Sequence, residues 1–210
     1  MSVGAEAYGT AIAHPDDHHE PHPPAANQSS RVDSRMLGML LFIGSEIMLF
    51  GAFFTAYFFI RVINEAPAWP PSPFHLPVFV ASVNTAVLVT SSFTIHWALQ
   101  SIKRGNRSGL KAGLVLTLLM GLTFLLTQFL EYARIGFGPS DGAFGTVFFS
   151  LTGLHGAHVF IGLMLLLFTT VRAFRGHFTP EHHHGVELPG IYWHFVDVMW
   201  IVVWATVYLI

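Results

Sequence analysis

Residues 36–60 read MLGMLLFIGSEIMLFGAFFTAYFFI, a mostly apolar stretch of 25 residues that contains neither lysine nor arginine. Four further stretches share this property, namely residues 77–99, 112–130, 144–171 and 190–210. About 20 apolar residues of helix cross the ~30 Å hydrocarbon layer of a bilayer, and each stretch approaches or exceeds that length. The sequence therefore predicts five membrane-spanning segments.

The composition of the whole chain excludes several classes of protein. Only 10% of its 210 residues are charged, against roughly 25% in soluble domains. A net charge of −2 excludes a strongly basic nucleic-acid binder, and the absence of cysteine excludes a disulfide scaffold, a zinc–thiolate site and a catalytic thiol. Lipid offers no water to the backbone, and the stretches are continuously apolar rather than alternating, so we expect helices and not barrel strands. The predicted fold is an all-α integral membrane bundle.

Lysine and arginine are spread unevenly over the segments that flank and join the five stretches. Along the chain these segments hold 2, 1, 4, 1 and 2 basic residues. One side of the membrane therefore receives eight of them and the other side two. Because cytoplasmic segments carry the excess of positive charge, we predict that the N-terminus lies inside and the C-terminus outside.

The first 35 residues differ in character from residues 36–210. They are polar, rich in histidine, proline and acidic residues, and lack the basic start and short apolar core of a secretory signal. We interpret them as a mobile tail that precedes a single five-helix transmembrane domain. The tail histidines could hold a metal weakly, but a solvated tail is the better interpretation; they are His14, His18, His19 and His22.

Two patterns of small residues indicate faces on which helices pack closely. Gly44 and Gly51 lie seven residues apart on one face of the first stretch. Gly153 and Ala157 form a small-xxx-small pair in the fourth stretch. We expect both faces to lie at contacts between helices.

Glu46 is the sharpest functional candidate, because an acidic side chain near the middle of a membrane span is costly and rare. It lies ~15 Å along the helix from Met36, near mid-membrane. One interpretation is a carboxyl group that handles protons. The other is an acid that only forms a hydrogen bond with a neighbouring helix or a lipid headgroup, and the sequence leaves both open.

Six other ionisable residues lie in the spans or at their edges, namely His96, Glu131, His155, His158, His194 and Asp197. His194 and Asp197 are three residues apart, so they share a helix face and form a candidate proton relay or a buried polar clasp between helices. His155 and His158 have the same spacing, which would suit a metal or a haem. Nothing supplies the rest of a ligand shell, so we expect no metal or haem on this chain. Glu131 stands at the edge of the third span.

Four ordered motifs and a short loop sequence carry a family resemblance. The motifs are GSEIMLFGAFFTAYF at residues 44–58, TQFLEY at 127–132, TGLHGAHVFIGL at 152–163 and YWHFVDVMWIVVWATVYLI at 192–210, with WPP at 69–71. Together they resemble the cytochrome c oxidase subunit III family of the haem–copper terminal oxidases.

This resemblance implies a multi-pass protein of the bacterial plasma membrane that carries no redox centre. Haem and copper would reside in subunits I and II of a proton-pumping cytochrome c oxidase. The chain would pack on subunit I, stabilise it and support proton uptake while O₂ is reduced to water in the respiratory chain. Bound phospholipid would accompany it, and membership of a respiratory supercomplex stays open.

The resemblance also assigns residues and a subtype. Glu46 corresponds to the family's membrane-buried glutamate, and the other polar residues of the spans occupy polar positions of its motifs, namely Glu131, His155, His158, His194 and Asp197. Family members with seven helices have two further helices before the glutamate helix, with a lipid-filled cleft beside them. This chain has a polar tail there, so it resembles the five-helix bacterial form, and whether another subunit supplies those helices stays open.

Three alternatives come from different readings of the same features. A similar subunit also serves quinol oxidases, and a related protein accompanies nitric oxide reductases. The histidines in the spans would suit a haem-binding electron-transfer subunit. Glu46 and Asp197 would suit a proton carrier that acts alone, although no repeated halves or broken helices point to a transporter.

Overall fold

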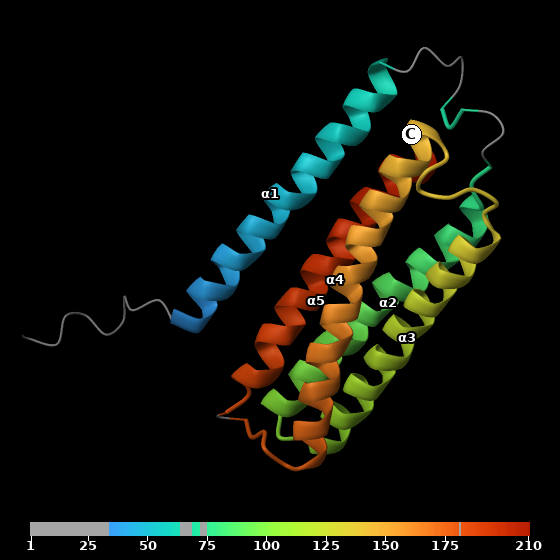
Figure 1. The fold of residues 1–210 in the computed structure, drawn as a ribbon. Helices are drawn as coiled ribbons and strands as arrows, with labels where there is room; N and C mark the ends of the chain where they lie inside the picture. Colours follow the sequence, from blue (N-terminus) through green and yellow to red (C-terminus); the bar gives the residue numbers. More distant parts are fainter. Residues whose placement is uncertain (1–33, 64–68, 72–74, 181) are drawn as a thin grey trace, which may run out of the picture. The chain divides into compact units, whose positions relative to one another are not determined.

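Five α-helices make up the part of the chain that the structure describes. This part, in a computed structural model, comprises residues 34–63, 69–71, 75–180 and 182–210. The helices are α1 (Ser34–Ile63), α2 (Val78–Lys103), α3 (Arg107–Arg134), α4 (Gly142–Phe174) and α5 (His184–Trp204), and a π-helical turn, η2 (Ala205–Leu209), follows α5 (Figure 1). All five are long and apolar enough to cross a membrane. The prediction of an all-α chain with five spans is confirmed, whereas the histidines of the tail lie outside the described residues.

Each membrane span, with η2 counted as part of the last one, is longer than the charge-free stretch that predicted it. The five spans have 30, 26, 28, 33 and 26 residues, so they extend beyond the ~20 residues that hydrocarbon requires and reach the polar interface. Of α2 to α5, only α3 begins at a side-chain cap. There the Asn106 side chain accepts a hydrogen bond from the Gly109 backbone at 2.9 Å, as expected of an asparagine N-cap.

α5 begins six residues earlier than the stretch 190–210 suggested, and it includes Pro189. A proline has no N–H, so the carbonyl four residues before it loses its helical partner. That carbonyl belongs to Gly185, and the Thr169 hydroxyl of α4 donates to it at 3.4 Å. A side chain of a neighbouring helix thus satisfies the carbonyl group that Pro189 leaves free.

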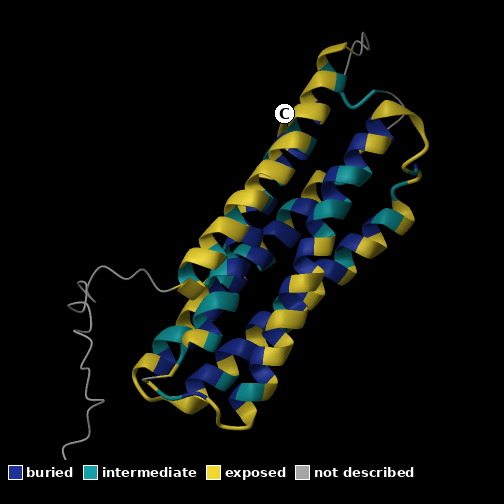
Figure 2. Cartoon of the chain, turned by 60° about the vertical axis from the view of Figure 1, so that its left-hand side comes forward, coloured by how far each residue is buried: buried dark blue, intermediate teal, exposed yellow. Residues whose placement is uncertain are grey.

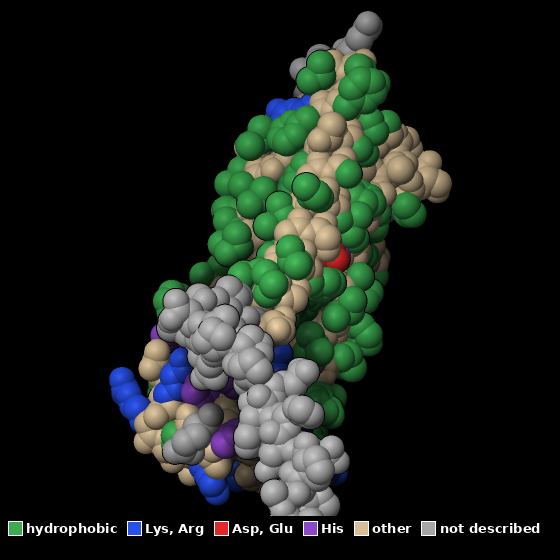
Figure 3. Space-filling view, turned by 90° about the vertical axis from the view of Figure 1, so that its left-hand side faces the viewer, with side chains coloured by type: hydrophobic (Ala, Val, Ile, Leu, Met, Phe, Trp, Pro, Cys, Tyr) green, Lys and Arg blue, Asp and Glu red, His purple; other side chains and the backbone are tan. Residues whose placement is uncertain are grey.

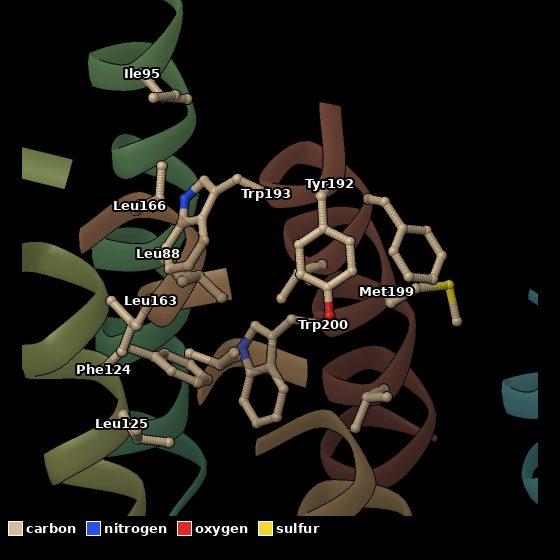
Figure 4. Close-up of a cluster of buried hydrophobic side chains, with 14 of the residues drawn as sticks. Leu88, Ile95, Phe124, Leu125, Leu163, Leu166, Tyr192, Trp193, Met199 and Trp200 are labelled. Atoms are coloured by element: carbon tan, nitrogen blue, oxygen red, sulfur yellow. The ribbon is translucent and has the colours of Figure 1, made fainter. Parts of the chain in front are cut away.

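α2, α3, α4 and α5 form a ring in which each helix packs on the next and α5 returns to α2. The core of this ring is aromatic: Trp193 and Trp200 extend from α5 between the other helices, and Trp200 meets the Phe124 ring at 4.8 Å (Figure 4). Both indole N–H groups are satisfied by α2. Trp193 donates to Ser91 Oγ and Trp200 to Thr85 Oγ1, each at 2.8 Å.

Glycines let the helices approach Trp193 closely, but they are not the glycines of the two small-residue patterns. A Cβ added to Gly121 would lie 2.5 Å from Trp193 Cη2, and one added to Gly162 would lie 2.9 Å from Trp193 Cε3. By contrast, a Cβ added to Gly44, Gly51 or Gly153 would meet nothing within 4 Å. The expectation that those patterns mark close contacts between helices is not met among the described residues, although what packs on these faces was left open by the sequence.

α1 stands beside the ring rather than in it. Its only buried side chains are those of Phe50 and Tyr57, and exposed residues cover most of its length (Figure 2). The Tyr57 hydroxyl donates to the Thr206 carbonyl at 3.2 Å and accepts from Trp69 Nε1 at 2.8 Å. Arg61 donates to the Ile210 carbonyl at 2.6 Å. These contacts join the end of α1 to the end of the chain.

Candidate functional site

The sharpest candidate, Glu46, forms a pair with His158 across the boundary between α1 and α4. Its Oε2 lies 2.8 Å from His158 Nε2, and the two side chains are 17% and 9% exposed respectively. The Phe50 ring lies 5.0 Å from the His158 ring and covers it from α1. The Glu46–His158 pair therefore sits at the rim of the ring of helices, where Glu46 keeps partial access to the surroundings.

The chemistry of this pair follows from the other nitrogen of the imidazole. His158 Nδ1 lies 2.8 Å from the Leu154 carbonyl, which can only accept, so Nδ1 carries a hydrogen. Nε2 then either accepts a hydrogen from a protonated Glu46 or donates one to its carboxylate. In both cases the pair holds one proton between the two residues. The shared proton can therefore lie on either residue within the same hydrogen bond.

The surroundings of the Glu46–His158 pair are apolar. Figure 3 views the side of the molecule on which α1 lies, where hydrophobic side chains cover most of the surface and acidic atoms are visible within it. Lys, Arg and His side chains gather at one end of this face. A polar pair in such a setting has little access to water, so its exchange of protons depends on what covers it.

His194 and Asp197 come together through a third residue that sequence reasoning missed. Ser92 of α2 donates to Asp197 Oδ2, and its Oγ lies 3.0 Å from His194 Nδ1. The serine has one hydrogen, which goes to the carboxyl group, so His194 Nδ1 donates to the serine oxygen. The predicted pair is thus a cluster of three residues that joins α5 to α2. A serine in the middle of an apolar span was the signal that could have identified it.

The two histidines of α4 point to different places. His155 is fully buried, its ring lies 4.8 Å from the Trp200 ring and 5.8 Å from the Phe124 ring, and neither ring nitrogen has a hydrogen-bond partner. His158 instead turns to Glu46. Among the described residues, no group of three or more histidine and acidic side chains is placed to hold a metal. The spacing that suggested a shared ligand site does not bring the two imidazoles to a common point.

Glu131 belongs to a cluster of polar side chains near the end of α3. Its Oε1 accepts from the Tyr208 hydroxyl at 2.8 Å, and its Oε2 has no partner. Next to it, the Tyr132 hydroxyl donates to Thr152 Oγ1 at 2.7 Å. Gln128, one turn earlier, is buried with both amide atoms unpartnered. Sequence reasoning named Glu131 in this cluster and missed Gln128.

A basic pocket of about 450 Å³ lies where the α4–α5 loop meets the start of α1. Its lining includes Arg35, Arg172, His177, His182 and His184. The Arg172 guanidinium also lies 5.4 Å from the centre of the Phe178 ring. Cationic side chains at the end of a membrane-spanning bundle are suited to an anionic headgroup.

A model of the cytochrome c oxidase subunit III family matches residues 25–210. The chain belongs to this family. It is 40% identical to cytochrome c oxidase subunit 3 of Thermostichus vulcanus over 211 residues, which cover 100% of this chain and 98% of that relative. It is also 40% identical to the Loxodonta africana subunit 3 over 192 residues and to that of Rattus norvegicus over 177 residues.

The comparisons confirm the family that the motifs indicated. The match covers 72% of the elephant protein and 67% of the rat protein, against 98% of the T. vulcanus protein. The mammalian relatives therefore contain considerably more sequence than the matched region, as expected of members with additional helices. The described residues contain five candidate spans, in agreement with the five-helix form.

Proposed function

We propose that this chain is the non-catalytic subunit III of an aerobic haem–copper cytochrome c oxidase and assembles with subunits I and II. The observation that carries this proposal is the family match over residues 25–210, together with 40% identity to a subunit 3 along the full chain. The names of the relatives favour cytochrome c over quinol as the electron donor. Haem and copper then belong to the partner subunits.

Within that complex, we assign to the Glu46–His158 pair a role in proton uptake. The pair holds one proton between two residues in an apolar setting, and Glu46 is accessible enough to exchange it with an adjoining surface. In the cluster of Ser92, His194 and Asp197 the acid is the enclosed group, since Asp197 is only 3% exposed. We assign to that cluster the structural role of a polar clasp between α2 and α5.

The orientation and the lipid environment complete the proposal. The basic segments between α2 and α3 and between α4 and α5 face the cytoplasm of a bacterium, and the N-terminus lies on the same side. The basic pocket around Arg172 binds the phosphate of an anionic phospholipid there. Because the chain has no cysteine, single cysteines at Ser108 and Ser140 report the orientation. An impermeant thiol reagent applied outside the cell is expected to label Ser140→Cys only, and labelling of Ser108→Cys alone would reverse the topology.

Gentle purification through a tag on this chain tests the complex. Subunits I and II are expected to co-purify, the complex to show haem absorption, and subunit II to carry a dicopper Cys/His motif. The isolated chain is expected to show no Soret band, since His158 and His194 are engaged by Glu46 and Ser92. A Soret band in the isolated chain, or the absence of subunits I and II, would contradict the proposal.

A further inference from the structure

A pocket of about 470 Å³ lies where α2 begins and α3 ends, at the opposite end of the bundle from the basic pocket around Arg172. Most of its lining is apolar, and its basic side chains are those of Arg134 and His75. Arg61, the other arginine at this end, donates to the Ile210 carbonyl. Arg134 is exposed and has no hydrogen-bond or ion-pair partner among the described residues. The pocket therefore presents a cation that no described residue of this chain engages.

The first turn of α2 adds backbone donors at the same level. It starts without a side-chain cap, and the amides of Phe79 and Val80 have no backbone acceptor among the described residues. Unpaired amides at the start of a helix attract anions. The acid in the wall of the pocket, Glu131, is turned inward, since its Oε1 accepts from the Tyr208 hydroxyl and its Oε2 is buried. The amides and the basic side chains are thus available to an anion.

A second pocket, of about 210 Å³, continues the first along the seam between α2 and α3, which pack side by side (Figure 1). The two pockets share Val80 and Thr127, and the second extends to Val87 and Thr123. Val87 lies nine residues after the start of α2, and Thr123 lies eleven residues before the end of α3. At 1.5 Å per residue, the seam groove formed by the two pockets reaches roughly 15 Å from the helix ends. It therefore runs from the polar end of the bundle into the depth of hydrocarbon.

Thr127 stands where the two pockets meet, and its hydroxyl group is free. Other threonines of the spans donate to the carbonyl four residues earlier, as Thr123 does to Leu119 at 2.8 Å. Thr127 has no hydrogen-bond partner among the described residues. It is half-buried and its oxygen is not enclosed, so an acceptor inside the seam groove can reach it. Because an unpaired hydroxyl is costly away from water, such an acceptor stabilises this position.

The order of these groups along the seam groove matches a phospholipid rather than a helix. The phosphate and ester oxygens of a phospholipid accept hydrogen bonds at its polar end, and an acyl chain without polar groups follows. In the seam groove the donors likewise come first, at Arg134, His75 and Thr127, and the valines of α2 follow. A transmembrane helix offers no equivalent acceptors, because its backbone carbonyls are bonded within the helix.

We propose that the seam groove between α2 and α3 binds a phospholipid of the adjoining leaflet. Arg134, His75 and the first turn of α2 hold its phosphate, Thr127 donates to an ester carbonyl, and an acyl chain lies along the valines of α2. The site lies at the other end of the bundle from the basic pocket around Arg172, and it does not depend on the proposed membership of an oxidase.

Photocrosslinking in the protein purified from its membrane, with the subunits that accompany it, tests the site. A photoreactive benzoylphenylalanine replaces Phe79, which lines the seam groove, and in a matched variant it replaces Phe93, a 72% exposed residue of the same helix. After washing in detergent, the Phe79 variant is expected to crosslink to a phospholipid, identified by mass spectrometry, and the Phe93 variant is expected not to. A Phe79 crosslink to a protein subunit, or no crosslink to lipid, overturns the inference and leaves the proposed function intact.

Charge substitutions in the Phe79 crosslinking variant test the phosphate contact. Arg134→Gln is expected to lower the lipid crosslink at least about tenfold, as for loss of a hydrogen bond to a charged group. Arg107→Gln, at the other end of the same helix, is the control and is expected to leave the crosslink unchanged. A lipid crosslink that survives Arg134→Gln, or that falls equally with Arg107→Gln, would overturn the proposal.

Two threonines of the seam groove give a smaller and stricter test. Thr127→Val removes the free hydroxyl with little change of shape, whereas Thr123→Val removes one that is already bonded within its own helix. We expect Thr127→Val to lower the lipid crosslink by about 2- to 10-fold and Thr123→Val to leave it unchanged. Equal effects of the two substitutions, or no effect of Thr127→Val, would overturn the contact with the ester carbonyl.

Discussion

α1 and α5 are both apolar and of membrane-spanning length, yet they are held in place by different means. In the most apolar 18 residues of the span formed by α5 and η2, 61% of the residues are buried, against 6% in α1. α5 fills the ring with Trp193 and Trp200. α1 is attached by isolated contacts instead, among them those of Glu46 and Tyr57. Packing of many large side chains thus holds α5, whereas a few polar contacts and two buried aromatic side chains, Phe50 and Tyr57, hold α1.

This difference bears on function, because regions with few buried contacts open at low cost. In the proton-handling candidate, the Glu46–His158 pair, Glu46 lies on the loosely attached helix α1, so small movements of α1 expose the pair to its surroundings. The Ser92–His194–Asp197 cluster instead joins α5 to α2, which are two helices of the packed ring. Four predictions test this contrast, ordered from the largest expected effect to the smallest.

Truncation of Trp200 would break the packing of α5. Trp200 is fully buried, donates to Thr85 and lies against Phe124 and His155. We expect Trp200→Ala to lower the free energy of unfolding by about 3–5 kcal/mol, since it removes a large core side chain. Thermal unfolding in detergent measures the effect. Trp97→Ala, at a 49% exposed site on α2, is the control, and an equal loss there would contradict a core role for Trp200.

A single added methyl group at Gly121 tests the slot that receives Trp193. The new Cβ would lie 2.5 Å from Trp193 Cη2, so the indole ring or α3 has to move. We expect Gly121→Ala to destabilise the chain by about 1–3 kcal/mol, the usual cost of overpacking. Gly51→Ala on α1 should not reproduce this loss, because that position is open. If the two variants unfold at the same temperature, the close contact between Gly121 and Trp193 does not limit the stability of the chain.

Two substitutions at Glu46 separate attachment of α1 from proton handling. Glu46→Gln keeps a hydrogen-bond donor for His158 Nε2 but replaces the acidic carboxyl group with an amide. Glu46→Leu removes the hydrogen-bonding group and the acid together. We expect Glu46→Leu to weaken attachment of α1 by about 0.6–1.7 kcal/mol, measured as faster hydrogen exchange in α1 with α2–α5 unchanged.

In the assembled oxidase, the Glu46→Gln variant tests whether Glu46 takes part in proton handling. Glu46→Gln is expected to leave assembly intact and to accelerate the loss of activity during turnover or to reduce pumping at high pH. If activity, pumping and assembly all match those of the original protein, Glu46 serves packing or lipid contact alone.

Tyr57→Phe should have the smallest effect. It removes the bond to the Thr206 carbonyl and leaves Trp69 Nε1 without its acceptor. We expect a loss of about 0.5–1.5 kcal/mol, confined to the end of α1 and visible as increased exchange near Tyr57. A loss spread over α5 would show that α1 is more strongly coupled to the ring than its few contacts indicate.

The sequence identified the candidate acids but not the residues with which the structure pairs them. Glu46, Glu131 and Asp197 could be found because acidic residues are rare inside spans. Their partners are ordinary residues on other helices: His158 for Glu46, Ser92 for Asp197. The spacing of three residues suggested that His155 and His158 act together, but they point to different neighbours. A helical period relates residues on one helix and carries no information about the helix opposite.

Hydropathy and charge by themselves predicted the five candidate spans that the described residues contain, because the cost of placing a residue in hydrocarbon depends on that residue and its near neighbours. Only the tertiary structure decided which helices form the ring, which glycines touch an indole, and which small residues make no close contact with another described helix. Gly121 and Gly162 are the close contacts, while a Cβ added to Gly153 would meet nothing within 4 Å. The physical reason is that lipid and helix surfaces are equally apolar, so packing in the membrane depends on shape and hydrogen bonds that only the folded chain brings together.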